Sequence, residues 1–378
     1  MVADANRRGY RHLLDGFWDE AHSLGLKLPT DEPVSAPAFC EARHKITTAL
    51  LRHMLRELAQ DSIEDLGSAN RWLGRRVFAV DGTKINLQRS PDLARDFGVP
   101  ESAHCPQALV SVLLDVCTKA PVDLAISPFA SSEREHLLAL LPSLAAGDVL
   151  VLDRGYPSHE VFQELAANGI DFLVRVPASH TFAAVDELRE GPGDDYIYHF
   201  DPPERSPESW TRLTLRVLGI TIDGSTSYFV TSLRRKDATR AQISQLYHMR
   251  WQAEEFFKLM KGDYIGQGQF RSKSPAGIKQ EIHALVLFLA IARLLMLTAA
   301  KSAGVDYQSL SQKAAVLGLA RYLTRLLLET HPERAVDHVQ RLLRHALTAC
   351  EKPRPGRRAP RISYRPRLRW SATGRCGG

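Results

Sequence analysis

The sequence predicts a mixed α/β protein whose sheet is covered by helices. Three observations favour this class: the order strand, strand, strand, helix, strand, helix, strand between residues 76 and 176; a β-rich stretch over residues 178–237; and helical periodicity on either side of both. The 378 residues are 44% hydrophobic and 24% charged, which is typical of globular proteins with two or three domains. This composition excludes a wholly disordered or fibrous chain.

Residues 1–70 are predicted to form a helical N-terminal region. Helical periodicity runs from Arg8 to Leu66 and is interrupted by the proline-rich segment 28–37. Three β-branched or aliphatic runs follow, over residues 76–80, 108–117 and 122–127. We expect these runs to be three consecutive antiparallel strands.

Two strand-helix-strand units complete the first part of the core, residues 71–177. Ser132-Glu133-Arg134-Glu135 is a capping box that opens a helix, and Gly147 ends it. A buried strand over residues 149–152 stops at Asp153, and a helix over residues 158–168 leads into a strand over residues 172–176. Right-handed crossovers between these strands require helices on the faces of a mixed sheet.

The second half of the chain is predicted to be β-rich first and helical afterwards. Residues 178–237 alternate short strands with Gly, Pro, Asp and Ser, and form an insertion. A long helix follows, with a capping box at Thr239 and Gln242 and its end at Gly262; residues 238–300 form the second part of the core. Residues 301–350 form a helical C-terminal region, a candidate for dimerisation, and residues 351–378 form a basic tail.

The excess of positive charge lies in the tail. The chain carries a net charge of +6, but residues 352–378 hold nine Lys and Arg side chains and no acidic one, so residues 1–351 carry −3. Such a tail cannot bury a core, so we expect it to be disordered alone and to lie along DNA by neutralising phosphates. The alternative is a solubilising terminus.

Several other kinds of site are not expected. The longest apolar run, residues 284–292, is much shorter than the ~20 residues of a membrane helix, and the N-terminus does not look like a secretory signal. We therefore expect a cytoplasmic protein with no membrane association. The five cysteines form no close pair and the 14 histidines show no ligand spacing, which argues against a disulfide framework or a zinc site.

Two aspartates follow predicted strands. Asp81 comes directly after the first strand and Asp153 directly after the fourth. A sheet holds such side chains rigidly while they project into open space, as catalytic carboxylates require. Taken singly, each is better explained as an ordinary turn former, especially with glycine close behind it.

Four polar side chains share one stripe of the long predicted helix. At ~100° per residue, Tyr247, Arg250, Glu254 and Lys261 fall within about 60° of one another, beside an apolar flank. The alternative is a solvated face with an incidental ion pair between Arg250 and Glu254, but it does not explain the tyrosine.

Two strand ends and the helix together supply three carboxylates, Asp81, Asp153 and Glu254. This all-oxygen set suits magnesium or manganese, and two such ions ~3.5–4 Å apart activate an attacking oxygen and neutralise a leaving one. Arg250 and Lys261 would hold phosphates, and Tyr247 would bond a phosphate or orient a carboxylate. The predicted chemistry is metal-dependent cleavage or transfer of DNA phosphodiesters.

These residues resemble a known family, the bacterial insertion-sequence transposases of the DDE type. The insertion-sequence-four-like group has the signature Tyr-x2-Arg-x3-Glu-x6-Lys, which Tyr247, Arg250, Glu254 and Lys261 match throughout. Three further segments resemble blocks of the family: Val80-Asp81-Gly82-Thr83, Leu152-Asp153-Arg154-Gly155-Tyr156 and Ala38-Phe39-Cys40-Glu41-Ala42-Arg43.

The resemblance implies a ribonuclease-H-like catalytic core with a β-strand insertion between the second Asp and the Glu. It implies that Asp81, Asp153 and Glu254 are a catalytic triad holding two magnesium ions. It also implies a homodimer that binds the terminal inverted repeats of its element, frees a 3′-hydroxyl and joins it to target DNA by cut-and-paste transposition. Region 1–70 would contact DNA, and the protein would act at the bacterial nucleoid.

Other residues have weaker claims to a role. Arg154, Arg271 and Lys273 are candidates for contacts with DNA phosphates. For Arg154 a surface arginine in a turn is the commoner explanation, whereas Arg271 and Lys273 are equally explained as part of a solvated loop. Trp210 is expected to be a core or strand residue rather than a platform for a displaced base.

Two other functions remain open from the sequence. A phosphatase of the Asp-x-Asp type would need a second aspartate two residues from Asp81, but Ala79 and Thr83 occupy those positions. A catalytically silent or inhibitory DNA-binding derivative of a transposase would keep the same motifs, so only activity separates it from the enzyme.

Overall fold

A single eight-stranded sheet forms the centre of the computed structural model, which describes residues 9–66, 71–178, 183–191, 193–222, 225–261 and 270–348. Its strands are β1 Val77–Asn86, β2 Gln107–Asp115, β3 Ala120–Pro128, β4 Val149–Leu152, β5 Asp171–Val176, β6 Asp195–Phe200, β7 Leu213–Ile222 and β8 Ser225–Thr231. The helices are α1 Tyr10–Ser23, α2 Ala36–Arg43, α3 Thr48–Leu66, α4 Pro91–Phe97, α5 Glu133–Leu140, α6 His159–Ala167, α7 Ala183–Glu190, α8 Arg240–Met249, α9 Trp251–Leu259, α10 Pro275–Ala303, α11 Gln312–Leu328 and α12 Pro332–Thr348.

The strands follow the order β3-β2-β1-β4-β5-β8-β7-β6. β1, β2 and β3 are antiparallel neighbours, whereas β1, β4 and β5 run parallel and are joined through α5 and α6. This is the arrangement that the order of elements predicts, because parallel neighbours need helical crossovers. The predicted mixed α/β class with a ribonuclease-H-like core is confirmed.

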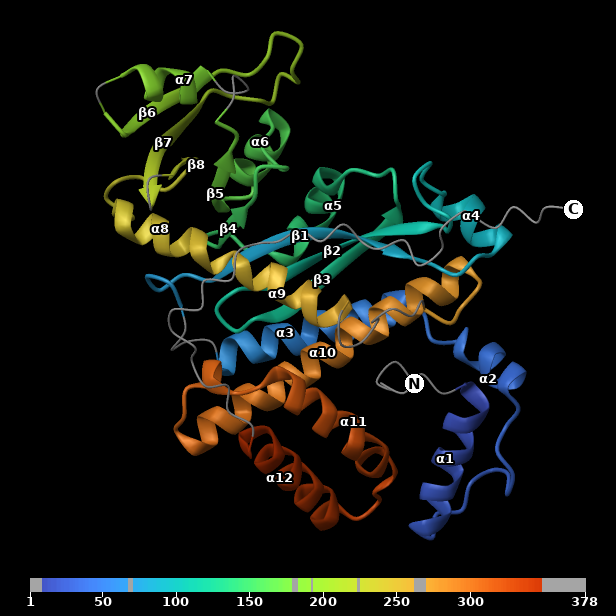
Figure 1. The fold of residues 1–378 in the computed structure, drawn as a ribbon. Helices are drawn as coiled ribbons and strands as arrows, with labels where there is room; N and C mark the ends of the chain where they lie inside the picture. The colour runs from blue at the N-terminus through green and yellow to red at the C-terminus, as the bar shows by residue number, and fades with distance from the viewer. Residues whose placement is uncertain are drawn as a thin grey trace, which may run out of the picture.

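The β-rich segment after β5 continues the sheet of the core. β8 pairs antiparallel with β5, with Val174 opposite Val230, and β7 and β6 follow outwards (Figure 1). β8 thereby covers an edge of β5 that would otherwise expose unpaired backbone groups. The same segment contains α7, a helix that the sequence patterns do not reveal.

Helices cover both faces of the sheet, as Figure 1 shows. Val77 and Ala79 of β1 belong to a core shared with α3, α8, α9 and α10, whereas Phe78 and Val80 belong to a core shared with α5, α6 and α7. This alternation is the period of two expected of a strand buried on both sides. It also assigns odd-numbered residues of β1 to the α9 face and even-numbered ones to the α5 face.

The long helix α10 is the central helix of the α9 face. Of the residues that the structure describes, only those of α10 form a helix long and apolar enough to cross a membrane, but 72% of its most apolar stretch is buried inside the protein. That burial is typical of a core helix in a globular protein.

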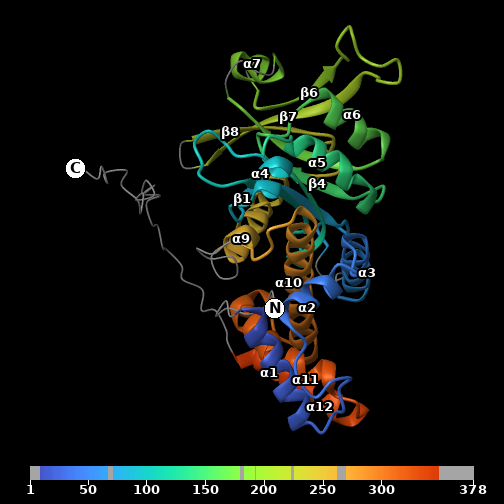
Figure 2. The same cartoon turned by 90° about the vertical axis from the view of Figure 1, so that its right-hand side faces the viewer.

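The N-terminal and C-terminal helical regions lie side by side below the sheet. Figure 2 shows α1 beside α11, at the end of α10 that lies away from the strands, and α11 packs in turn against α12. Arg325 of α11 pairs with Glu20 of α1, and Met296, Ala315 and Ala346 pack together between α10, α11 and α12. The basic tail, with Cys350 and Cys376, lies outside the described residues.

Candidate active site

Asp81 lies within β1, so the prediction that it directly follows the strand is wrong. β1 pairs with β2 along its whole length, with Asp81 opposite Val112, but it pairs with β4 only as far as Ala79. The antiparallel hairpin prolongs the strand beyond the predicted end at Val80. Asp81 is therefore held by a neighbouring strand on one side while the other side is open.

Asp153 occupies its predicted position, directly after β4. The backbone amide of Gly155 donates to Asp153 Oδ1 at 2.8 Å, and that of Gly82 donates to Asp81 Oδ1 at 3.1 Å. Because β1 and β4 are parallel neighbours, the two carboxylates lie at the same end of the sheet.

The two carboxylates interact electrostatically. Burial raises the pKa of Asp81 from 3.8 to about 6, the charge of Arg250 opposes this shift, and the charges of Asp153 and Glu133 add to it. A buried carboxylate beside like charges is unfavourable unless a cation neutralises it. The geometry therefore creates a site of negative potential at the open side of β1.

The helix that carries the signature is divided at Arg250 into α8 and α9, which corrects the prediction of one continuous helix. Its predicted capping box is present: Gln242 N donates to Thr239 Oγ1 at 3.3 Å and Thr239 N donates to Gln242 Oε1 at 2.8 Å. At the division, Arg250 N donates to the Tyr247 carbonyl at 3.1 Å, a three-residue spacing that tightens one turn. Gly262, the predicted end, lies outside the described residues.

Tyr247, Arg250 and Glu254 come together as the stripe predicts. Arg250 Nη2 donates to Glu254 Oε1 at 2.5 Å, and its guanidinium lies 5.6 Å from the centre of the Tyr247 ring. The Tyr247 ring packs edge-on against Phe229 of β8, with 4.7 Å between ring centres. Tyr247 thus joins the signature helix to the last strand of the insertion.

Two cations of the stripe face Asp81. Arg250 lowers the pKa of Asp81, and Asp81 in turn favours the charged form of Lys261. Lys261 is exposed, yet desolvation by the surrounding protein lowers the pKa of its ammonium group, an effect that Asp81 partly offsets. α9 packs against β1, which brings both cations to this end of the sheet.

The Glu254 carboxylate pairs with Arg250 in this structure. Within the described ranges, no three His, Cys, Asp or Glu side chains are spaced to hold one metal ion. The Asp81 and Asp153 pair, with its oxygen donors and like charges that Arg250 offsets only in part, fits a divalent cation.

The weaker candidates are placed as follows. Arg154 is exposed in the turn after β4. The Arg271 guanidinium lies 5.7 Å from the centre of the Tyr10 ring, and the carbonyl of the exposed Lys273 accepts a hydrogen bond from Ser90. These contacts attach the loop of Arg271 and Lys273 to α1 and to the start of α4.

Trp210 corrects the expectation of a core or strand position. It is only partly buried and lies in the loop between β6 and β7, where its backbone amide donates to the Pro207 carbonyl. The turn around Pro207 keeps Trp210 in the loop, between the end of β6 at Phe200 and the start of β7 at Leu213.

Sequence reasoning missed two residues of the site, Glu133 and Tyr156. Both influence the aspartates electrostatically: Glu133 raises the pKa of Asp81, and Tyr156 is a buried side chain whose pKa responds to Asp81 and Asp153. Glu133 stands inside the capping-box sequence, which accounts for it as part of a helix start. Tyr156 stands in the turn after Asp153, where nothing local predicts its complete burial.

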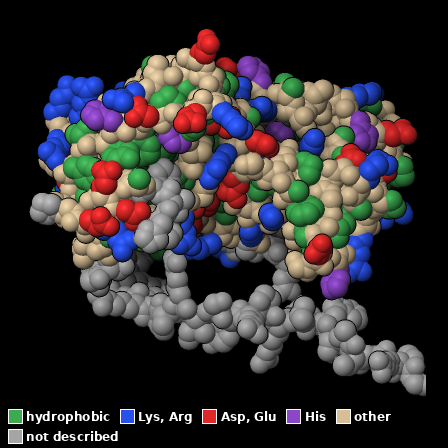
Figure 3. Space-filling view, turned by 90° about the horizontal axis from the view of Figure 1, so that it is seen from above, with side chains coloured by type: hydrophobic (Ala, Val, Ile, Leu, Met, Phe, Trp, Pro, Cys, Tyr) green, Lys and Arg blue, Asp and Glu red, His purple; other side chains and the backbone are tan. Residues whose placement is uncertain are grey.

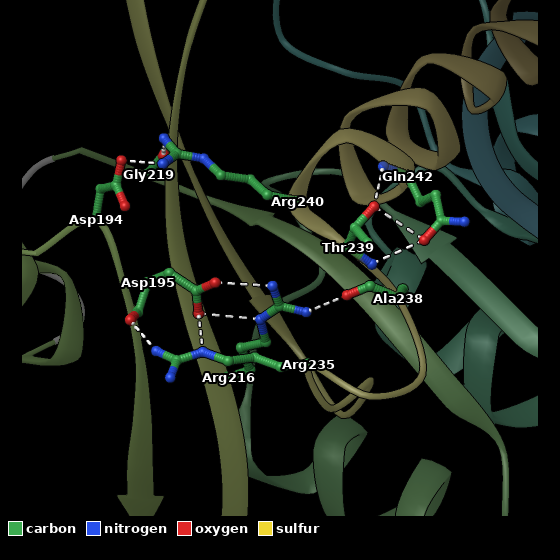
Figure 4. A network of polar contacts seen from close by, with 9 residues as sticks. All are labelled: Asp194, Asp195, Arg216, Gly219, Arg235, Ala238, Thr239, Arg240 and Gln242. Atoms are coloured by element: carbon green, nitrogen blue, oxygen red, sulfur yellow. Dashed lines mark hydrogen bonds and ion pairs between the residues drawn. The ribbon is translucent and has the colours of Figure 1, made fainter.

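A polar network joins the insertion to the start of α8 (Figure 4). The buried Arg216 of β7 donates to both oxygens of Asp195 on β6, at 3.0 and 2.8 Å, and to the carbonyl of Ala238 at 2.6 Å. Arg240, the first residue of α8, contacts Asp194 and the carbonyl of Gly219. The insertion strands thereby fix where the signature helix begins.

Charges of both signs are interspersed on the face seen in Figure 3, and no continuous basic plane covers it. This agrees with the net charge of −3 on residues 1–351, since the excess of basic residues belongs to the tail. Attraction of a polyanion to this body therefore depends on local groups rather than on a uniform field.

Comparison with known proteins identifies the family. The family described as "Transposase DDE domain" matches residues 72–291, more than half of the chain. A similar solved structure is the cryo-EM structure of the piggyBac transposase synaptic complex with hairpin DNA, with 11% identity, a TM-score of 0.43 and coverage of 71% of this chain. This chain spans 57% of the length of that chain, and no curated protein matches it. The match over residues 72–291 shows that the chain belongs to the DDE transposase family.

Proposed function

We propose that this chain is an insertion-sequence transposase of the cut-and-paste type, with Asp81, Asp153 and Glu254 as its catalytic carboxylates. The observation that carries the proposal is the placement of Asp81 and Asp153 on parallel neighbours β1 and β4, with Arg250 and Lys261 facing Asp81 from the signature helix. The matching spacing of the signature supports the insertion-sequence-four-like group and a bacterial origin, with the protein acting in the cytoplasm at the nucleoid.

Asp81, Asp153 and Glu254 would hold two divalent cations, magnesium or manganese. Bound there, the ions would activate the attacking oxygen and neutralise the leaving one. The chain's own contribution is to place Asp81 and Asp153 at the open side of β1, where Arg250 offsets their like charges only in part.

Arg250 and Lys261 would position the DNA backbone, with Tyr247 supporting the arginine. The Nε of Arg250 is buried and has no hydrogen-bond partner among the described residues. A phosphate could satisfy this donor and compete with Glu254 for the guanidinium, because Arg binds phosphate through paired donors. Binding of DNA would then free Glu254 to join the two aspartates. Arg154, Arg271 and Lys273 would contact the backbone further along.

The partners implied are double-stranded DNA at the terminal inverted repeats and at the target, and a second copy of the chain in the DNA complex. Region 1–70 would contribute to DNA binding, region 301–350 to dimerisation and the tail 351–378 to general affinity. Sedimentation with and without end DNA tests the homodimer, which should form on the DNA.

A catalytically silent derivative is the second candidate, favoured by the pairing of Glu254 with Arg250. Incubating the purified protein with magnesium and a donor DNA that carries the inverted repeats flanking its gene separates the two. The enzyme should cut the element ends, whereas the silent derivative should bind them without cutting.

Replacing the glutamate of the signature tests its catalytic role. Glu254→Gln should retain DNA binding and lose magnesium-dependent cleavage, because the amide keeps the shape but removes a metal ligand. Glu255→Gln is the matched control, since Glu255 is exposed on the same helix and pairs with Lys258. Cleavage by Glu254→Gln at the rate of the control would sink the assignment of the triad.

A further inference from the structure

Glu133 reaches the end of the sheet that carries the two aspartates, on the face opposite to α9. It is the first residue of α5 and is half-buried, and its carboxyl group lies directly over Gly82. A Cβ atom added at Gly82 would come within 2.5 Å of Glu133 Cδ and 2.7 Å of Oε1. Because side chains alternate along β1, Asp81 projects to one face and Gly82 leaves the other face open. Only glycine at position 82 lets the Glu133 carboxylate approach β1 this closely.

The position of Glu133 is fixed from two directions. The capping box of α5 orders its first turn, with Arg134 N donating to Ser132 Oγ at 3.1 Å. Arg134 Nε also donates to the carbonyl of Gly155 at 3.1 Å, which ties the start of α5 to the turn that follows Asp153. Glu133 is therefore held between the strand of Asp81 and the turn of Asp153.

Glu133 interacts electrostatically with both aspartates. Burial and the charge of Asp153 raise the pKa of Glu133, and the charge of Glu133 adds to the raised pKa of Asp81. Together with the contact over Gly82, these effects place Glu133 near both aspartates.

A buried hydroxyl points into the same region. Tyr156 is 0% exposed, and its Oη is buried without a hydrogen bond of good geometry among the described residues. Burial raises its pKa well above the usual value, and the charges of Glu133, Asp81 and Asp153 add to this, in that order. Glu133 has the largest effect of these charges, and a buried hydroxyl without a well-formed bond is satisfied by a water, an ion or a small shift of the neighbouring carboxylate.

We propose that Glu133 is a fourth acidic residue of the cation site, where it holds water molecules of a divalent ion bound by Asp81 and Asp153, and that the Tyr156 hydroxyl orients its carboxylate. The inference rests on the proposed function. Magnesium keeps several of its waters and takes only one or two carboxylates directly, so an outer carboxylate is chemically suited to it. This role also agrees with the absence, within the described residues, of three acidic groups spaced for one ion. Glu133 is thus a positioning residue.

Binding of manganese to the full chain without DNA tests the inference. Free Mn²⁺ is measured by electron paramagnetic resonance at constant pH. Glu133→Gln should weaken binding by about 10-fold, the lower end of the range for loss of an outer-shell partner. Glu135→Gln is the matched control: it removes the same charge from the same exposed first turn, and glutamine preserves the capping box. It should bind Mn²⁺ like the unaltered chain.

Gly82→Ala provides a second route, because its methyl group would displace the Glu133 carboxylate without altering any acidic side chain. It should weaken Mn²⁺ binding to the same degree, and the double variant with Glu133→Gln should be no weaker than either alone. Tyr156→Phe should also weaken binding, though less.

The outcomes separate this inference from the proposed function. If Asp81→Asn weakens Mn²⁺ binding but Glu133→Gln matches Glu135→Gln, the role of Glu133 is overturned while the aspartate site stands. If Asp81→Asn leaves binding unchanged, both are overturned. A Glu133→Gln protein that melts like the control without metal, yet binds Mn²⁺ 10-fold more weakly, supports the inference.

Discussion

Removing the charge of Asp81 should stabilise the protein when no metal is present. The pKa of Asp81 in the folded chain is about 6, against an ordinary value of 3.8, chiefly because the carboxyl is buried. At about 1.4 kcal/mol per pH unit, this shift corresponds to about 3 kcal/mol. Asp81 is partly exposed, so solvent screening reduces the expected effect to about 2 kcal/mol.

The sign of the effect follows from linkage. The folded chain binds the Asp81 proton more tightly than the unfolded chain does, so the free energy of unfolding falls as pH rises from about 4 to about 6. The cost of holding an ionised Asp81 in the folded chain is complete above about pH 7 and absent below about pH 4. Asp81→Asn should therefore raise the free energy of unfolding by about 2 kcal/mol at pH 8 in a chelator and by nothing at pH 4.

Urea unfolding at pH 8 and pH 4 measures the difference, with Asp201→Asn as the control because Asp201 forms only an exposed pair with Arg212. Added magnesium should stabilise the unaltered chain and leave Asp81→Asn unaffected. An Asp81→Asn protein that is no more stable than the control at pH 8 would refute the reasoning, since it would show that the folded chain does not penalise this charge.

Three other perturbations test separate parts of the molecule. Arg216→Met should lower the free energy of unfolding by about 1–3 kcal/mol, because it leaves the partly buried Asp195 carboxylate with only the exposed Arg235 as a partner and leaves the carbonyl of Ala238 unpaired. Arg212→Met at an exposed pair should cost less than about 1 kcal/mol, and equal losses in urea would contradict this. Lys261→Met should weaken binding of all DNA sequences and reduce the slope of log affinity against log salt concentration by about 1. Lys258→Met is the control, because Lys258 is an exposed lysine paired with Glu255 of its own helix, and it should change neither quantity. Truncation after Glu351 removes nine basic residues, so binding should become weaker and less dependent on salt in a titration; an unchanged slope would count against the role of the tail.

The sequence predicts elements whose causes are local. Both capping boxes, at Ser132 and Thr239, are present because a hydroxyl and a carboxyl or amide three residues apart satisfy the first amides of a helix wherever it packs. Asp153 is correctly placed because β4 is short and buried on both faces, so its apolar run ends where the strand ends. In each case the residues that determine the structure are neighbours in the chain.

Features that depend on distant partners escape the sequence. β1 extends past Asp81 because β2 pairs with it as far as Asn86. Beyond Ala79 the strand has a neighbour on one side only, and its polar residues lack the apolar pattern by which a strand is recognised in the sequence. The helix is divided at Arg250, where the backbone tightens and the side chain meets Glu254, although 3.6-residue periodicity runs through the division. Glu133 escapes because the capping sequence already explains a glutamate there, and only the backbone of Gly82 shows that its carboxyl has a second neighbour.

The polar network at the start of α8 gives the insertion a role in forming the site. Arg216 joins β7 to β6 and to the residue before the capping box, so the strands of the insertion hold the first turn of the signature helix. Tyr247, two turns later, packs against Phe229 of β8, and β8 pairs with β5 of the core. Arg250 follows on the next turn and faces Asp81. The insertion thus links the sheet to the arginine through rigid elements, and a displacement of β7 and β8 would move Arg250 relative to Asp81 without any change in the strands that hold the two aspartates.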